Sequence, residues 1–449
     1  MKASAISEYV RGDTIAAEST PPGRGGISVI RLSGEQALSI AKKVFSNKLP
    51  SGGQFAFGKI HRLENPNHVI DHGVVLVYEK PHSYTGEDTV EFSLHGSPVV
   101  VAEVLNELFQ AGARQAGPGE FTLRAYLNSK IDLTQAEAVA DLIEARSGTA
   151  AEAAVLQLGG RLKSAADALS DRLMNVLMLS EIELDFSEDE TVLIGSEQKI
   201  IIIDEILESL AELSDGYAKS KNIREGIDVT IIGAPNVGKS SLLNALLGKS
   251  RAIVHDTPGT TRDIVEGACV IGGVQFRFND TAGLRAGAGQ IEDEGIVRAK
   301  ASASEADLVL LVRSIDMPDE IEISVERKSI YIDVLNKIDL SEHSEVKCDI
   351  GVSAKTGYNI DKLKELLVAK IGNDNITSAS VINRERHLVA VREAQEAVAC
   401  ARQLLIDEDF SELIAEELRI ALEAMDRITG KRQSEGLLDK IFAGFCIGK

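Results

Sequence analysis

A glycine-rich segment near the middle of the chain has the composition of a phosphate-binding loop. Residues 233–240 read Gly-Ala-Pro-Asn-Val-Gly-Lys-Ser. They stand between an apolar run at 228–232, which predicts a strand, and residues 241–247, which predict a helix. The backbone N–H groups of such a loop and the positive end of its helix attract phosphate. We therefore expect Lys239 to reach the outer phosphates of a nucleotide and Ser240 to bind Mg²⁺.

Four further motifs follow in the order typical of GTP-binding proteins. Residues 259–261 offer a hydroxyl to Mg²⁺, most simply from Thr261, and residues 280–283 place a carboxylate near the metal and an N–H near the third phosphate. After a strand predicted at 330–335, Asp339 can accept two hydrogen bonds from guanine that adenine cannot donate, and residues 353–355 complete the base pocket. The sequence therefore predicts GTP as the nucleotide. The residues expected to contact it are Asn236, Val237, Gly238, Lys239, Ser240, Ser241, His255, Asp256, Thr257, Pro258, Gly259, Thr260, Thr261, Asp280, Thr281, Ala282, Gly283, Asn336, Lys337, Asp339, Ser353, Ala354 and Lys355.

A leucine, Leu284, follows Gly283 at the position where Ras-like GTPases carry a water-orienting glutamine. Leucine forms no hydrogen bond, and the charge that develops between the second and third phosphates still needs a cation. An arginine finger is one solution and a monovalent cation is another. Asn236 could offer its side-chain carbonyl to such an ion, and the backbone carbonyls of residues 255–260 could surround it.

The attacking water also needs a partner, and Glu292 is a candidate that would act through a bridging water. It lies in the glycine-rich segment 286–294 and is followed by Asp293 and Glu294. A solvated acidic surface residue is the competing interpretation, and the residues by themselves leave both open.

Composition limits the remaining possibilities. The chain has 449 residues, which predicts two or three domains, and a net charge of −21, which disfavours nonspecific nucleic-acid binding by the whole surface. No apolar run is long enough to span a bilayer, so we expect no membrane association. The four cysteines are widely spaced without a CxxC pair, which fits a cytoplasmic location rather than a disulfide framework.

The pattern of elements predicts an insertion. Strands are expected at Ile27–Arg31, Val74–Tyr78 and Thr89–Leu94, and a helix at Val99–Phe109. From residue 134 apolar residues recur at helical spacing, and a similar helical pattern returns only after residue 384. The first stripe includes Leu162, Leu169, Leu173, Val176 and Leu177, and the second includes Leu413, Ile414, Leu418, Leu422 and Met425. Between them, residues 222–375 alternate strands and helices. Two half-bundles with apolar stripes each need a partner, so we favour one helical domain interrupted by an α/β domain over two independent helical domains.

The chain resembles the MnmE (TrmE) family of tRNA-modification GTPases over its full length. The resemblance rests on the GTPase motifs and on segments at 21–26 (PPGRGG), 85–88 (TGED), 118–125 (PGEFTLRA), 133–138 (LTQAEA) and 445–449 (FCIGK). It implies a multidomain α/β architecture. Residues 1–120 would form an α+β folate-binding and dimerisation domain, and 121–220 and 377–449 the two parts of a helical domain. Residues 221–376 would form an inserted Ras-like P-loop GTPase domain with a mostly parallel sheet.

The resemblance also implies ligands. A tetrahydrofolate (5-formyl or 5,10-methylene) would bind at positions matching Arg31, Glu91, Lys130 and Lys449, with cations for its glutamate tail and a carboxylate for its pterin. Cys446 would lie near the same site, with its role open. Potassium would bind at positions matching Asn236, His255, Thr257 and Thr260, and Glu292 matches the catalytic glutamate. A hydroxyl residue is expected at position 255 and an aliphatic one at 257; backbone coordination would tolerate both changes.

The activity implied is GTP hydrolysis coupled to dimerisation of the GTPase domains. The homodimer would join a flavin-dependent partner, MnmG (GidA), in a heterotetramer that modifies carbon 5 of the tRNA wobble uridine to an aminomethyl or carboxymethylaminomethyl form. Two other classes compete. One is a ribosome-assembly GTPase of the Era or Der type, which the acidic charge and the Cys-Ile-Gly-Lys ending disfavour. The other is a helical scaffold with a vestigial GTPase, which the intact nucleotide motifs disfavour.

Overall fold

The computed structural model describes residues 12–185, 196–248, 267–280, 306–316, 330–340, 346–372, 382–407, 411–432 and 434–449. The chain groups into two compact units. The first comprises residues 1–140, 157–199 and 400–449, and the second comprises residues 141–156 and 200–399. Among the described residues, no helix combines the length and apolar character needed to cross a bilayer.

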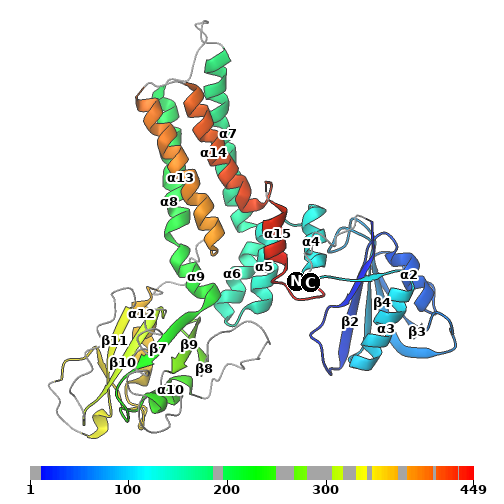
Figure 1. Cartoon of the computed structure of the whole chain (residues 1–449), viewed down its shortest axis with the longest axis horizontal. Helices are drawn as coiled ribbons and strands as arrows, with labels where there is room; N and C mark the ends of the chain where they lie inside the picture. Colours follow the sequence, from blue (N-terminus) through cyan, green and yellow to red (C-terminus); the bar gives the residue numbers. More distant parts are fainter. Residues whose placement is uncertain are drawn as a thin grey trace, which may run out of the picture. The chain divides into compact units, whose positions relative to one another are not determined.

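The first unit contains a six-stranded sheet in the order β3-β4-β5-β2-β1-β6 (Figure 1). Its neighbours pair antiparallel, except that β1 and β6 are parallel. Alternate residues of these strands are buried against helices α2 and α3 in one apolar core. The elements are β1 (Ile15–Glu18), β2 (Ile27–Ser33), α2 (Ala37–Val44), β3 (Gln54–His61), β4 (Val69–Tyr78), β5 (Thr89–His95), α3 (Pro98–Gln110) and β6 (Arg114–Gln115). The strands expected in β2, β4 and β5 and the helix expected in α3 are confirmed.

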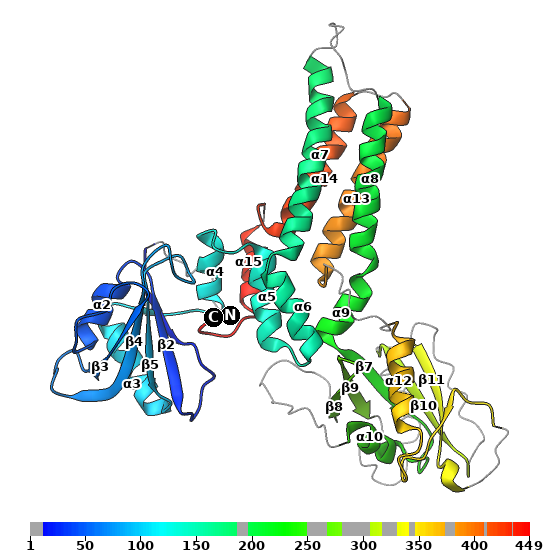
Figure 2. The same ribbon diagram turned by 180° about the vertical axis from the view of Figure 1, so that it is seen from behind.

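The helices of the first unit follow this sheet and return at the end of the chain. They are α4 (Glu120–Leu127), the first part of α5 (Leu133–Glu144), α7 (Arg161–Asp185), α14 (Ser411–Thr429) and α15 (Glu435–Phe442). Helices α7 and α14 lie side by side in both views (Figures 1 and 2). They run antiparallel, because Arg419 pairs with Glu181 near one end and Lys431 with Asp167 near the other. Two segments more than 200 residues apart in sequence therefore share one core, as an insertion requires.

Most of the apolar stripe residues that predicted these helices are buried. On α7 they are Leu162, Leu169, Leu173, Val176 and Leu177, and on α14 they are Ile414, Leu418, Leu422 and Met425. Leu413, at the start of α14, is the exception and is exposed. The stripes bury apolar surface against each other, and packing of this kind supplies most of the stability of helices in proteins.

The second unit is built around a sheet in the order β12-β11-β10-β7-β9-β8. All its strands are parallel except β8, which is antiparallel to β9. The strands are β7 (Ile227–Ile232), β8 (Gly267–Ile271), β9 (Val274–Asp280), β10 (Leu308–Ser314), β11 (Ile330–Asn336) and β12 (Ile350–Gly351). The helices of the unit include α6 (Gly148–Leu158), α8 (Ser196–Asp215), α9 (Tyr217–Glu225), α10 (Lys239–Leu247), α12 (Ile360–Lys370) and most of α13 (Glu385–Ile406).

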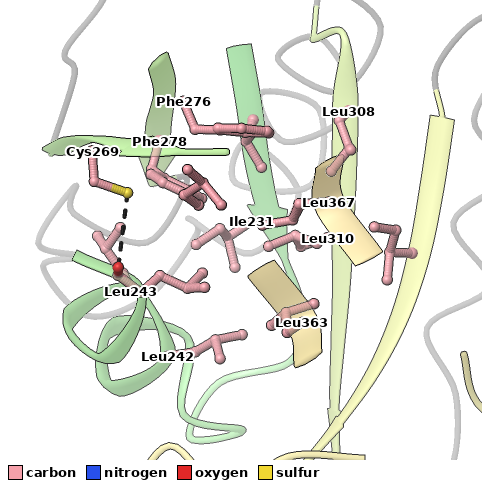
Figure 3. Packing of buried hydrophobic residues seen from close by; sticks show 14 of the residues in the cluster. Ile231, Leu242, Leu243, Cys269, Phe276, Phe278, Leu308, Leu310, Leu363 and Leu367 are labelled. Carbon is pink, nitrogen blue, oxygen red and sulfur yellow. Dashed lines mark hydrogen bonds between the residues drawn. The ribbon is translucent and has the colours of Figure 1, made fainter. Parts of the chain in front are cut away.

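One face of this sheet packs against helices α10 and α12, as is typical of a parallel sheet, whose faces are covered by helices. Figure 3 shows Phe276, Phe278 and Leu310 from the strands packing with Leu243 of α10 and Leu363 of α12. The Sγ of Cys269 lies 3.8 Å from the Leu246 carbonyl oxygen, and burial raises the pKa of this thiol. The predicted α/β region is thus a Ras-like fold with a mostly parallel sheet, and the predicted fold class is confirmed.

Candidate functional sites

The described nucleotide motifs gather at one edge of the second sheet. The loop of residues 233–238 follows β7, Asp280 ends β9, Asn336 ends β11, and Ser353 comes two residues after β12. Because the carboxyl ends of parallel strands meet at the same edge, four segments far apart in sequence converge there. The open α/β sheets of nucleotide-binding proteins place their ligands at this edge.

The phosphate loop has the backbone that its glycines permit. A Cβ at Gly233 would lie 2.2 Å from the Val312 carbonyl oxygen, and a Cβ at Gly238 would lie 2.4 Å from Asn336 Nδ2. Gly238 has φ +96°, a conformation that favours glycine. Lys239 Nζ donates to the carbonyl oxygens of Gly233 and Ala234, each at 2.9 Å. The ammonium group therefore lies over the loop that would receive phosphate.

Asn336 connects the base motifs with the phosphate loop. Its Nδ2 donates to the Val237 carbonyl oxygen at 2.9 Å, and its Oδ1 accepts from the Ala354 N–H at 3.0 Å. Ser353 Oγ donates to Asp339 Oδ1 at 2.6 Å, which leaves Asp339 exposed and oriented. The predicted base-reading residues thus form one connected group with the phosphate loop.

Asp316 belongs to this group but was not predicted. Lys337 Nζ lies 3.0 Å from Asp316 Oδ2, and Ser314 Oγ donates to the same carboxylate. Hydrogen bonds from Ser314 and then Lys337 hold the pKa of Asp316 below its ordinary value. The strand register, which pairs Ser314 with Asn336, brings the two segments together. No motif marks Asp316 in the sequence; only the pairing of β10 with β11 reveals it.

Several predicted site residues lie outside the described residues. They are His255, Asp256, Thr257, Pro258, Gly259, Thr260 and Thr261, together with Thr281, Ala282, Gly283, Leu284 and Glu292. The described part of the site therefore contains the phosphate loop and the base motifs. Asn236, the loop residue expected to meet potassium, is exposed with φ +66°, and Ser240 and Ser241 are exposed at the start of α10.

Two of the predicted folate residues are paired in the first unit. Arg31 on β2 and Glu91 on β5 are cross-strand neighbours, and Arg31 Nε donates to Glu91 Oε1 at 2.9 Å. The Arg31 guanidinium carbon lies 5.3 Å from the ring centre of Tyr84 and 5.5 Å from that of Phe121. Within the described part of the chain, no residue accepts a hydrogen bond from Arg31 Nη1 or Nη2, and none donates to Glu91 Oε2. The pair therefore keeps the two terminal nitrogens of Arg31 as donors, and the second carboxylate oxygen of Glu91 as an acceptor, for a ligand.

The end of the chain lies against the start of α4. The Lys449 carbonyl oxygen accepts from the Phe121 N–H at 3.2 Å, and the Gly448 carbonyl oxygen accepts from Ser19 Oγ at 3.0 Å. Phe121 thus contacts both Arg31 and the terminal lysine, while Cys446 nearby is exposed. Lys130, the fourth predicted folate residue, donates from Nζ to the Pro81 carbonyl oxygen at 3.0 Å, in the loop that also carries Tyr84.

A buried charge network supports α4. Arg124 and Glu120 are both fully buried and lie 2.9 Å apart, and Arg114 binds Glu120 from the adjacent strand β6. Asp13 binds both arginines. Burial alone would raise the pKa of Glu120, but hydrogen bonds from Arg114, the Gly117 N–H and Arg124 more than offset it and hold the pKa below its ordinary value. The network fixes the helix that carries Phe121.

The fold and its edge motifs define the class: a GTPase of Ras-like fold, inserted into a helical domain that follows an α+β N-terminal domain. Family comparisons agree with this class. The model of the MnmE helical domain matches residues 133–446, and the model of the GTP-binding protein TrmE N-terminus matches residues 14–130. The chain belongs to the MnmE family of tRNA modification GTPases, and as a member it is a GTP-hydrolysing enzyme.

Curated relatives match over nearly the whole chain. The tRNA modification GTPase MnmE of Legionella pneumophila (strain Corby) is 40% identical, over 97% of this chain and 99% of the relative. The MnmE proteins of Nitrosomonas eutropha and Chlorobium phaeobacteroides are 42% and 41% identical, over 97% and 99% of this chain and 99% of each relative. Among solved structures, Era of Aquifex aeolicus is similar over 38% of this chain and 66% of its own, with 27% identity and a TM-score of 0.26. At that score the likeness adds nothing to the assignment.

Proposed function

We propose that this chain is a potassium-dependent GTPase that works with a flavin-dependent partner of the MnmG (GidA) type on the wobble uridine of tRNA. The reaction would install an aminomethyl or carboxymethylaminomethyl group at carbon 5, with a one-carbon unit from tetrahydrofolate. The observation that carries this proposal is the family match, because it extends over the N-terminal domain, the helical domain and the chain end together.

The edge of the second sheet supports the GTP part of the proposal. The loop at 233–240 would bind the phosphates with Lys239, and the exposed hydroxyl of Ser240 would bind Mg²⁺ together with Thr261. Asp339, held by Ser353, would read guanine. The motif at 280–283 would respond to the third phosphate, and closure around it would couple hydrolysis to a change of state.

Potassium would supply the positive charge that stabilises the transition state. Leu284 can neither supply charge nor orient the attacking water. Asn236 is exposed in the phosphate loop, as a ligand of such an ion must be, and the 255–260 segment would complete the coordination. Glu292 would orient the water. The test compares GTP hydrolysis by the full chain in potassium and in sodium at equal ionic strength. We expect at least tenfold faster hydrolysis in potassium, and Glu292→Ala should retain GTP binding but lose most turnover. Equal rates in both salts would refute the ion's role.

The Arg31–Glu91 pair supports a folate site. The free Glu91 oxygen can accept from the amino-pyrimidine edge of a pterin, and the Arg31 terminal nitrogens can donate to its oxygen or to a carboxylate. The pairing means that these two residues meet the same part of the ligand, so Lys130 and Lys449 remain for the glutamate tail. Titration calorimetry with 5-formyl-tetrahydrofolate tests this, and absence of heat from the wild-type chain would contradict it.

The remaining parts of the proposal concern assembly and substrate. We propose a homodimer through residues 1–120, transient dimerisation of the GTPase domain at 221–376, and a helical domain formed by 121–220 and 377–449. Together with the partner it would form a heterotetramer in the cytoplasm, where tRNA is modified. Nucleoside analysis of bulk tRNA from a strain lacking this protein tests the substrate. Unchanged carbon-5 modification of the wobble uridine would overturn it, and would favour a ribosome-assembly role.

A further inference from the structure

The surroundings of Arg31 fix its guanidinium more tightly than an ion pair alone would. The guanidinium lies against two aromatic rings, those of Tyr84 and Phe121, at 5.3 and 5.5 Å. Its Nε is bound by Glu91, and the side chain is only 16% exposed. Such cation–π contacts hold the plane of a guanidinium, and they are strongest when water is largely excluded. The terminal nitrogens are therefore held in one direction while their donors stay available.

Residues in the first turn of α4 position the rings of both Phe121 and Tyr84. The Phe121 side chain is fully buried with Ile15, Ala17 and Ala116. The next residue, Thr122, is within hydrogen-bond distance of the Tyr84 hydroxyl, at 2.9 Å. One helical turn thus supplies one ring directly and anchors the other.

The same turn also holds the end of the chain. The Phe121 backbone N–H donates to the carbonyl oxygen of Lys449, and the Gly119 N–H donates to that of Cys446 at 3.3 Å. The first of these contacts comes from the backbone of Phe121, the residue whose ring lies against Arg31. A displacement of Phe121 would therefore move two of the cations assigned to the folate site at once.

We propose that Phe121 is a positioning residue of the tetrahydrofolate site, with Tyr84 as its counterpart: their rings orient Arg31, and the Phe121 amide docks the C-terminal lysine. This inference rests on the proposed folate function. Its physical basis is preorganisation, since a guanidinium already held in its binding orientation loses less freedom when the ligand arrives.

Substitutions separate this role from simple core packing. Phe121→Leu keeps an apolar side chain but removes the π face, and Tyr84→Leu does the same in the partly exposed loop. Tyr84→Phe keeps the ring and removes only the hydroxyl. Phe45→Leu is the matched control, because Phe45 is a buried phenylalanine of the same domain that packs in the α2–α3 core. Each variant is made in the full chain and titrated calorimetrically with 5-formyl-tetrahydrofolate, and GTP hydrolysis and thermal midpoint are recorded alongside.

The loss of one cation–π contact predicts folate binding weaker by about threefold to about thirtyfold in Phe121→Leu and Tyr84→Leu. Tyr84→Phe keeps the ring but loses its hydrogen bond to Thr122, so its affinity should lie between those of wild type and Tyr84→Leu. Phe45→Leu should stay within about twofold of wild type, although it lowers the thermal midpoint. GTP hydrolysis without folate should be unchanged in all four. If Phe121→Leu does not fold, the two Tyr84 variants still decide the question.

The outcomes distinguish the two proposals. If the wild-type chain binds no tetrahydrofolate, the folate function fails, and the positioning role fails with it. If the wild type binds but the Leu variants bind as tightly as Phe45→Leu, the folate site stands and the positioning role is overturned. A weakening that follows the thermal midpoint across all variants, Phe45→Leu included, would likewise reduce Phe121 to a packing residue.

Discussion

Asn336 donates from its side-chain nitrogen to the backbone carbonyl of Val237, 99 residues earlier in the chain, at 2.9 Å. Through the same amide it accepts from the Ala354 N–H, so one side chain that is 2% exposed joins the phosphate loop to both base motifs. The close approach also explains Gly238, where a Cβ would meet the Asn336 nitrogen. The position of the phosphate loop relative to the base motifs therefore depends on a buried amide rather than on a charge.

Asn336→Ala should weaken the binding of both GTP and GDP. The substitution leaves the buried Val237 carbonyl without its partner, which costs about 1–3 kcal/mol, and it also removes the acceptor of the partly buried Ala354 N–H. Because the phosphate loop and the base pocket both lose a support, we expect affinity for either nucleotide to fall by at least tenfold, measured with fluorescent GDP and GTP analogues.

Asn244→Ala is the control for that experiment, since Asn244 is an exposed asparagine on α10 of the same domain. It should leave both affinities unchanged. A selective loss of GTP with GDP binding intact in Asn336→Ala would contradict the structural link, because the phosphate loop and the base motifs that Asn336 joins would meet parts that both nucleotides share.

Local motifs in the sequence marked the segments that the structure brings together at one edge of the second sheet, because phosphate and guanine recognition need fixed residue types at fixed spacings. The same reasoning could not find Asp316 or the pairing of Arg31 with Glu91. Those contacts depend on strand register, and a shift of one residue would turn each side chain to the other face. The apolar spacing predicted the stripe of α14 but not that Leu413 would be exposed, since periodicity locates a face but not where its partner helix ends.

Asp141 on α5 binds side chains from two other segments of the second unit. Its carboxylate accepts from Arg384 Nη2 at 2.5 Å and from Asn383 Nδ2 at 3.3 Å, and Arg224 Nη1 lies 3.8 Å away. Arg224 is near the end of α9, just before β7, and Arg384 immediately precedes α13. Both chain segments that bound the GTPase sheet therefore meet one carboxylate, whose side chain is 7% exposed.

Asp141→Ala should destabilise the protein substantially. Removing one partner of a buried ion pair costs about 3–5 kcal/mol, and the partial exposure of both arginines and the ion pair between Arg224 and Glu225 favour the lower end. We expect a lower midpoint of urea unfolding followed by circular dichroism. Glu416→Ala, which breaks an exposed pair with Arg419, should shift it little, since such pairs contribute about 0–1 kcal/mol. Equal shifts would mean that Asp141 is solvated.

Glu120 should make the free energy of unfolding depend on pH in the acid range. Its pKa is lowered in the folded state from a reference of 4.5, so below that value the unfolded chain binds more protons than the native one. The stability contributed by Glu120 is therefore fully present above about pH 4.5 and is lost as pH falls through the folded pKa. Glu120→Gln should be less stable than wild type at pH 7, and the difference should shrink in acid.

Urea midpoints measured from pH 7 down to pH 3 test this, with Glu64→Gln as the control. Glu64 is an exposed glutamate of the same domain, and its replacement should leave the pH profile of the wild type unchanged. A constant gap between wild type and Glu120→Gln over the whole range would show that Glu120 is not ionised in the native network.

The backbone conformation of Gly448 should be required for the chain end to stay bound to the start of α4. It has φ +94°, and a Cβ there would lie 2.0 Å from the Glu18 carbonyl oxygen, so an alanine meets both backbone strain and a clash with main chain that cannot move aside. A strain of about 1–2 kcal/mol already corresponds to a shift of about tenfold in the docking equilibrium. In Gly448→Ala, carboxypeptidase B should therefore release Lys449 at least about tenfold faster, with little change in the thermal midpoint. Gly444→Ala is the matched control, because the nearest atom to its Cβ would be 3.5 Å away. If both variants and the wild type release lysine at one rate, the chain end is not held by Phe121 in solution.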